Sequence, residues 1–237
     1  RAFRRDKKEA AIALLENAQE LQLSNFEKAK VKMTLADILV MQEKFDQALI
    51  YYSQVQNLVK NDIMAQDARF KVAKTSYYKG DFEWAKTQLD ILKKSTSQLI
   101  ANDAMELSLL INDNSQEDST QTALKKYARA DLLAFQKRNS EAISMLDTIL
   151  ETHKGESIED EALYAQAKLF EYEASYDRAE NNYLQIIQSY GDDILADNAH
   201  FYLAELYVSK LEHPEKAKTL YEQIIFNFAN SIYFTDA

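Results

Sequence analysis

The residues that most often carry chemistry are sparse in this chain, and their spacing does not suit a catalytic or metal site. The 237 residues include three histidines and no cysteine, so disulfides and thiolate metal ligands are excluded. His153, His200 and His213 lie at irregular intervals, and neither an HExxH motif nor a Glu-x-x-His pair occurs. We therefore predict no catalytic residue, no cofactor and no metal ion, and we expect that the protein is not an enzyme.

Acidic side chains gather where helices are expected to begin. The runs at 159–161 and 192–193 occupy such positions, where negative charge offsets the helix macrodipole and caps free N–H groups. The run at 113–118 lacks the glycine and the terminal glutamate of an EF-hand loop. These clusters are therefore interpreted as helix caps rather than as acid–base pairs or a calcium site.

Aromatic rings next to charges, which are suited to recognition, are better represented. Bulky residues recur along the chain, and each is followed four residues later by a charge: Met33–Asp37, Phe70–Lys74, Tyr127–Asp131, Tyr164–Lys168 and Phe201–Glu205. Further rings lie beyond them, at Tyr77, Tyr78, Phe135 and Tyr172. Aromatic anchors surrounded by charge are typical of peptide-binding grooves. The alternative, which the sequence leaves open, is that these rings pack between neighbouring structural repeats.

Helices must position these residues. The chain has 3 glycines and 1 proline, whereas average usage would give about 28 of the two together. Apolar residues recur at spacings of three and four, which indicates long helices joined by short connections. We predict an all-α fold of about twelve helices, at approximately 6–23, 25–42, 45–60, 62–79, 81–94, 97–112, 120–137, 140–153, 158–173, 176–190, 194–210 and 214–228.

A pair of helices repeats along the chain. Small residues recur in pairs across a turn, twelve positions apart in four pairs and thirteen in the last: Ala36/Ala48, Ala73/Ala85, Ala130/Ala142, Ala167/Ala179 and Ala204/Ala217. The first alanines follow one another at intervals of 37 residues, except for 57 between the second and third pairs. Small residues allow two antiparallel helices to approach closely, so we expect all ten alanines to be buried.

Residues 70–92, FKVAKTSYYKGDFEWAKTQLDIL, show the repeat most clearly. With a small residue in the first helix, an aromatic residue in the turn and an alanine in the second helix, the chain resembles the tetratricopeptide-repeat (TPR) family over nearly its whole length. The resemblance implies a right-handed α-solenoid of antiparallel helix pairs. It also implies that first helices line a concave face that contacts peptide ligands, so that the aromatic and charged residues above would lie on that face.

Two departures from the family pattern are visible. The 37-residue unit is longer than the roughly 34 residues usual in the family. The position where the family has a tryptophan is filled by Lys32, Arg69, Lys126 and His200. Because the other repeats place Lys or Arg there, His200 is expected on the surface. The longer unit is similar to that of bacterial envelope TPR proteins, such as the outer-membrane assembly lipoprotein and the Tol–Pal-associated periplasmic factor.

The 57-residue interval contains one extra helix, near 97–112, which predicts a kink or a junction there. We expect an N-terminal TPR segment at 1–112, an exposed loop at 113–119 and a C-terminal TPR segment at 120–237. The first and last residues fall within a repeat, so a fragment of a longer chain is expected.

Charge and hydropathy narrow the choice of partner. Residues 1–119 carry 17 basic and 18 acidic side chains, and residues 120–237 carry 11 and 20. The acidic second half argues against nucleic acid, and no apolar run approaches the roughly 20 residues of a membrane span. We therefore predict an interaction scaffold that binds a protein or peptide partner in the concave groove. The alternative is a structural module that forms a homo-oligomer. The compartment is left open between the bacterial periplasm, at the outer membrane, and the cytoplasm.

Overall fold

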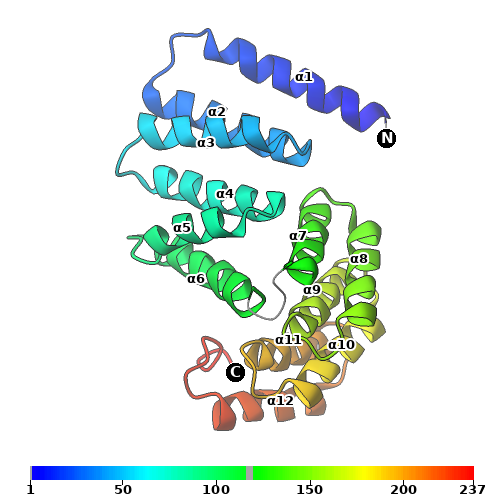
Figure 1. Cartoon of the computed structure of the whole chain (residues 1–237). Helices are drawn as coiled ribbons and strands as arrows, with labels where there is room; N and C mark the ends of the chain where they lie inside the picture. Colours follow the sequence, from blue (N-terminus) through cyan, green and yellow to red (C-terminus); the bar gives the residue numbers. More distant parts are fainter. Residues whose placement is uncertain (1, 116–119) are drawn as a thin grey trace. The chain divides into compact units, whose positions relative to one another are not determined.

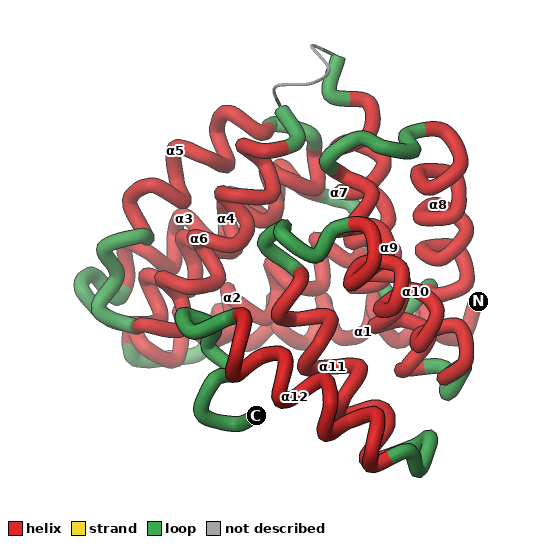
Figure 2. The backbone as a smooth tube through the Cα atoms, turned by 90° about the horizontal axis from the view of Figure 1, so that it is seen from below, coloured by secondary structure: helices red, strands yellow, loops and turns green. Residues whose placement is uncertain are grey.

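The computed structural model describes residues 2–115 and 120–237, and all regular structure in these ranges is α-helical (Figures 1 and 2). The predicted all-α fold with about twelve helices is confirmed. The helices are α1 (Ala2–Gln19), α2 (Asn25–Met41), α3 (Phe45–Leu58), α4 (Ile63–Lys79), α5 (Phe82–Leu92), α6 (Gln98–Asp113), α7 (Thr122–Phe135), α8 (Asn139–Thr152), α9 (Ile158–Tyr172), α10 (Tyr176–Ser189), α11 (Ala196–Ser209) and α12 (Pro214–Asn227).

The chain divides into two compact units, residues 1–119 with α1–α6 and residues 120–237 with α7–α12. Within each unit, every helix packs against the next one in the sequence, which makes each unit an α-solenoid of antiparallel helix pairs. Each unit buries its own row of apolar side chains between the helices. The predicted kink between the two segments stays a prediction.

The same turn joins the two helices of four pairs, α2/α3, α4/α5, α7/α8 and α9/α10, whereas the turn between α11 and α12 is longer. In these four turns the central residue adopts the left-handed conformation, as Glu43, Gly80, Lys137 and Ala174 all do with φ between 56° and 83°. The next backbone N–H donates to the carbonyl oxygen five residues back, as in Asp81 to Ser76 at 2.9 Å. This pattern is a Schellman motif, which satisfies the last carbonyls of the first helix and reverses the chain. Only one of these turns uses glycine.

The paired alanines are buried as predicted. All ten have at most 2% of their surface exposed. A helix with no side chain beyond Cβ at this point lets its antiparallel neighbour come close, and larger residues on either side then fill the core. The paired alanines therefore mark the points at which the two helices of each pair pack closely.

Helix starts follow the local signals in part. Ser24 and Glu27 form a capping box at α2, and Asp62 Oδ1 accepts the backbone N–H of Met64 at 2.8 Å in α4. Asp81, by contrast, makes no side-chain capping bond at α5. The acidic run at 159–161 lies in the first turn of α9, and Glu159 accepts the N–H of Gly155 in the preceding turn.

The extra helix is present as α6, which packs against α5 and α4. The predicted exposed loop at 113–119 is partly wrong, since Asp113 ends α6 and Asn114 is buried with 6% exposed. The Asn114 side chain donates to the Leu110 carbonyl at 2.9 Å, which extends the end of the helix. Residues 116–119 lie outside the described residues.

The prediction that His200 lies on the surface is wrong. His200 is 6% exposed, and its ring centroid is 5.2 Å from that of Phe228. Its Nδ1 lies 2.7 Å from the carbonyl oxygen of Ala196, which can only accept, so Nδ1 is the donor. Lys32 and Arg69 at this repeat position are long enough to reach solvent, whereas the shorter imidazole is covered.

We expect Ala73→Leu to lower the free energy of unfolding by about 1–3 kcal/mol, because the added atoms push α4 and α5 apart. Urea denaturation followed by circular dichroism measures this change. Ala10→Leu, at an exposed position on α1, is the matched control and should change stability by less than about 0.5 kcal/mol. Equal effects of the two substitutions would contradict the close packing at Ala73.

We expect Ala174→Gly to raise the free energy of unfolding by about 1 kcal/mol, because Ala174 has a φ of 56° that an L-residue adopts at a cost. Ala167→Gly, in the interior of α9, should lower it by about 1 kcal/mol or more. The same urea experiment compares both. A loss of stability in Ala174→Gly would show that the turn is not strained.

Candidate functional site

Four of the predicted contact residues line one pocket in the second unit. Tyr127 and Asp131 come from α7, and Lys168 and Tyr172 come from α9. The cavity has a volume of about 320 Å³ and lies between these two first helices. The apolar residues that complete it are Ala130, Ala134, Leu146, Ala165 and Leu169. The sequence pattern thus brought residues together that are up to 45 positions apart.

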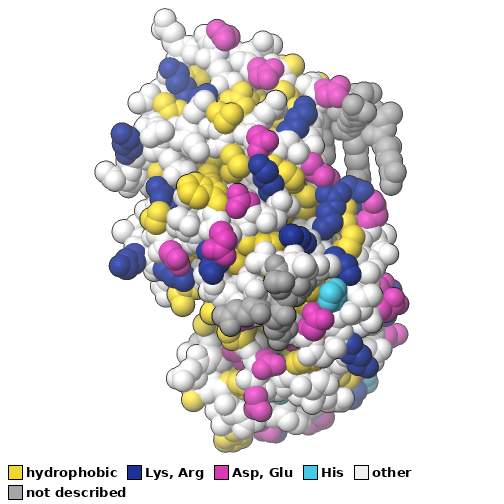
Figure 3. All heavy atoms as spheres, in the orientation of Figure 1, with side chains coloured by type: hydrophobic (Ala, Val, Ile, Leu, Met, Phe, Trp, Pro, Cys, Tyr) yellow, Lys and Arg dark blue, Asp and Glu magenta, His cyan; other side chains and the backbone are white. Residues whose placement is uncertain are grey.

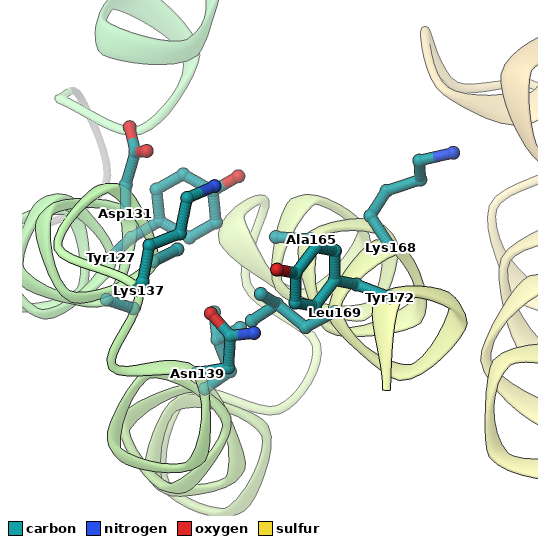
Figure 4. Close-up of a pocket in the computed structure, with 11 residues that line it drawn as sticks. Tyr127, Asp131, Lys137, Asn139, Ala165, Lys168, Leu169 and Tyr172 are labelled. Atoms are coloured by element: carbon teal, nitrogen blue, oxygen red, sulfur yellow. The ribbon is translucent and has the colours of Figure 1, made fainter. Parts of the chain in front are cut away.

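The pocket has aromatic walls and a polar rim (Figure 4). Tyr127 stands on the α7 side and Tyr172 on the α9 side, with Leu169 and Asn139 between them. Tyr172 is 70% exposed, which is unusual for so large a ring. Lys137, from the turn between α7 and α8, places its ammonium 5.6 Å from the centroid of the Tyr172 ring. The pocket therefore offers apolar surface with a cation beside it.

Lys168 lines the pocket but directs its charge elsewhere. Its Nζ lies 3.6 Å from the centroid of the Tyr202 ring on α11 and 3.2 Å from Glu171 Oε1. Figure 4 shows the side chain pointing away from the gap between α7 and α9. The aliphatic stem of Lys168 thus forms part of the wall, while its ammonium is held by a cation–π contact and an ion pair.

Tyr164 and Phe201 belong to a cluster of rings that spans the next repeat. The ring centroids of Tyr164 and Tyr202 lie 6.1 Å apart. Phe201 stacks on Tyr233, with 4.3 Å between ring centroids and an interplanar angle of 14°. Both residues are half-buried. Both rings contact a tyrosine of their own helix pair and a tyrosine beyond it, which agrees with the packing alternative left open by the sequence.

Two carboxylates of the predicted set accept hydrogen bonds from tyrosines of the paired second helix. Tyr52 donates to Asp37 Oδ1 at 2.6 Å, and Tyr221 donates to Glu205. Tyr183 donates in the same way to Glu171, which was not predicted. Burial is the largest cause of the raised pKa of Tyr52, and the charge of Asp37 adds to it, so this hydroxyl stays protonated and keeps donating.

In the first unit the predicted charged residues contact neighbouring side chains. Asp37 makes an ion pair with Lys71, at 2.7 Å and 2.8 Å. Lys74 lies over the rings of Tyr77 and Tyr78, at 5.0 Å and 5.4 Å from their centroids.

Tyr77 is completely buried and Met33 is 9% exposed, so their assignment to partner contact is corrected. Tyr77 packs against Phe82 in the turn, which makes it part of the scaffold. Of the remaining rings, Phe70 and Tyr78 are half-buried, and Phe135 is 38% exposed.

The sequence reasoning missed Lys137, Asn139 and Ala165 as lining residues. Lys137 lies in the turn between α7 and α8 and Asn139 is the first residue of α8, whereas the predicted contact residues all lie on first helices. The repeat register could have indicated Lys137. It lies 57 residues after Gly80, which is the repeat interval that includes the extra helix, so both occupy the same position in their turns. Among the described residues, no group of three or more His, Asp or Glu is placed to hold a metal ion, and no helix is long and apolar enough to cross a membrane.

Asp67, on α4, is half-buried and its pKa is raised. Burial is the largest cause, and the negative charges of Asp37 and Asp103 add to it, while Lys71 acts in the opposite direction. The folded protein therefore binds this proton more tightly than the unfolded chain does. Asp67 consequently destabilises the fold as the pH rises through its raised pKa, and this cost disappears in acid.

We expect Asp67→Asn to melt at a higher temperature than the wild type at pH 7, with the difference narrowing as the pH is lowered. Asn keeps the shape of the side chain without the buried negative charge. Differential scanning calorimetry over a pH series measures the effect. Asp46→Asn is the control, because that carboxylate is 81% exposed and bonded to Lys79. No gain for Asp67→Asn at pH 7 would contradict the role assigned to burial.

Comparisons with known proteins add the following. No protein-family model matches the sequence, and no curated protein matches it. The chain is similar to the solved structure of a MamA double mutant (MamA RS-1 ArsTM), with 14% identity and a TM-score of 0.40, over 84% of this chain and 93% of that one.

It is also similar to YrrB, described as a TPR protein with an unusual peptide-binding site, with 16% identity and a TM-score of 0.42, over 97% of each chain. A third similar structure is the P58(IPK) TPR domain, with 16% identity and a TM-score of 0.40, over 99% of this chain and 60% of that one. The chain is thus similar to solved TPR structures. At these identities and scores, its function has to be inferred from its own residues.

Proposed function

We propose that the protein is a non-enzymatic interaction scaffold that binds a peptide segment of a protein partner at the second unit. One apolar side chain of that segment occupies the pocket between α7 and α9. The observation that supports this most directly is the pocket of about 320 Å³ with a 70% exposed tyrosine at its edge. A large exposed ring beside a recess is the usual form of a binding anchor.

The chemistry of the pocket favours a peptide with an apolar anchor. Its walls are alanine and leucine side chains and two tyrosine rings, so burial of an aliphatic or aromatic side chain removes apolar surface from water. Asp131, Lys137 and Asn139 at the rim supply groups that pair with a peptide backbone or with flanking charges. A segment that crosses both first helices reaches all of these groups.

We expect Tyr172→Ala to weaken peptide binding by about tenfold or more, since loss of an anchoring ring costs more than about 1 kcal/mol. The peptide is obtained by selecting a random phage-displayed library on the intact protein. Its affinity is then measured by fluorescence polarisation with the wild type and the variants. Ala165→Phe, which fills the pocket from the α9 side, should have the same effect.

Phe226→Ala is the matched control, because Phe226 is an exposed ring of the same unit that does not line the pocket. It should bind the selected peptide as the wild type does. Circular dichroism confirms that each variant is folded. Selected peptides that bind Tyr172→Ala and Ala165→Phe as tightly as the wild type would contradict the proposal.

Self-association is a second candidate function, and exposed apolar side chains favour it. Phe226 on α12 is 80% exposed, and Ile232, which follows that helix, is 76% exposed. Light scattering on the same samples separates the two functions. A stable dimer that Phe226→Ala disrupts and Tyr172→Ala leaves intact would favour self-association through this face.

A further inference from the structure

A second groove lies in the first unit, on helices that the pocket between α7 and α9 does not involve. It is a cavity of about 730 Å³ between the second helices α3 and α5, with the first half of α4 between them. α4 packs against both flanking helices. Trp84, the single tryptophan of the chain, and Ile91 line it from α5 and are 49% and 53% exposed. In the space-filling view, hydrophobic side chains are exposed among charged ones over α3 to α5 (Figure 3).

The groove is positively charged, although the whole chain has a net charge of −10. Lys60, Arg69 and Lys94 line it, and Asp62 is its single acidic residue. The Asp62 carboxylate is already engaged, since its Oδ1 accepts the N–H of Met64 at the start of α4. Within residues 2–115 and 120–237, none of the three basic side chains has an ion pair or a side-chain hydrogen bond.

The preceding repeat has a cavity at the equivalent place, of about 410 Å³ and lined by Lys32, but there the cation has partners of its own. Lys32 occupies the same repeat position as Arg69, 37 residues earlier. Its ammonium donates to Gln19 and Gln54, at 2.8 Å each, and lies 5.2 Å from the centroid of the Tyr51 ring. Lys126, at this position in the second unit, lies 3.2 Å from both Thr152 Oγ1 and His153 Nε2. In these repeats the groove supplies its own partners for the cation.

At Arg69 two of the Lys32 partners are replaced, whereas Gln19 corresponds to Gln56, which lines the groove. Gln54 corresponds to Ile91, which cannot accept a hydrogen bond, and Tyr51 corresponds to Gln88. Gln88 is 8% exposed, lines the groove, and has no hydrogen-bond partner among the described residues. The Gln88 amide and the half-buried Arg69 guanidinium are therefore both available to a ligand in the groove. Both groups lie in a recess whose apolar side is an exposed tryptophan.

We propose that this groove docks an acidic peptide segment of a protein partner. A carboxylate of the segment pairs with the Arg69 guanidinium, and an apolar side chain of the segment packs against Trp84 and Ile91. The planar guanidinium binds a carboxylate through two parallel hydrogen bonds, and Lys60 and Lys94 attract further acidic residues. Gln88 offers an amide that pairs with a backbone N–H or carbonyl group. This site is independent of the pocket between α7 and α9.

The single tryptophan makes the proposal directly measurable. The intact protein is titrated with a short synthetic peptide of glutamates that carries one phenylalanine and one leucine, and the emission of Trp84 is recorded. We expect a saturable shift to shorter wavelength, because the peptide covers the indole ring. The apparent affinity should fall as salt is added, since it depends on charge pairing. A peptide with lysine in place of every glutamate should give no saturable shift.

Variants test the named contacts. Arg69→Gln should weaken binding about tenfold or more, and Lys94→Gln should weaken it by a smaller factor. Lys86→Gln removes a charge from α5 outside the groove and should bind as the wild type does. Tyr172→Ala should also bind normally, so failure at one site is distinguishable from failure at the other.

Several outcomes would overturn the proposal. One is an equal response to the acidic and the lysine peptides, and another is unchanged affinity in Arg69→Gln. A stronger response to a single-stranded oligonucleotide would show that the groove binds nucleic acid rather than an acidic peptide. A shift in Trp84 emission with protein concentration alone, lost in Arg69→Gln, would make the occupant the acidic surface of a second copy of this chain.

Discussion

The close approach of paired antiparallel helices is the constraint on which the rest of the structure depends. Two helices lie this near to each other only where both present almost no side chain, and here ten alanines with at most 2% exposure supply that condition. In four of the five pairs, the turn after the first helix also brings the helices together, because a residue in the left-handed conformation lets the chain reverse at once. The buried alanines and the turn recur along the chain, so the helix pairs place corresponding residues at corresponding positions.

Equivalent positions do not have equivalent roles, and the difference comes from the neighbouring repeat. Tyr164 and Phe201 lie at the same place in successive first helices as Tyr127. They meet the rings of Tyr202 and Tyr233 and become part of the packing between repeats. Tyr127 instead faces small residues, Ala130 and Ala165 among them, and the space that these leave is the pocket. The volume of the side chain that the next repeat places opposite each ring thus decides whether a pocket or a packed contact forms.

Electrostatics follows the same rule. Several charges on the first helices have internal partners, such as the Tyr52 hydroxyl for Asp37 and the Tyr202 ring for Lys168. These partners reduce the cost of leaving a charge at a half-buried position. Arg69 has no such partner among the described residues, and two of the three residues that hold Lys32 in the preceding repeat, Gln54 and Tyr51, correspond to Ile91 and Gln88. The two candidate sites therefore differ in character, one being an apolar recess and the other a cationic groove beside an exposed indole.

The sequence alone was sufficient for the helices, the 37-residue period, the buried alanines and the capping role of Asp62, because each depends on residues within a few turns of one another. It also selected Tyr127, Asp131, Lys168 and Tyr172, which line one pocket. It could not tell that Tyr77 is buried, that His200 is covered by Phe228, or that Lys137 reaches Tyr172 from a turn. Those outcomes depend on which side chains of another helix fill the facing space. Periodicity shows which face of a helix a residue occupies, but only the packed tertiary structure decides whether that face meets a neighbour, a cavity or water.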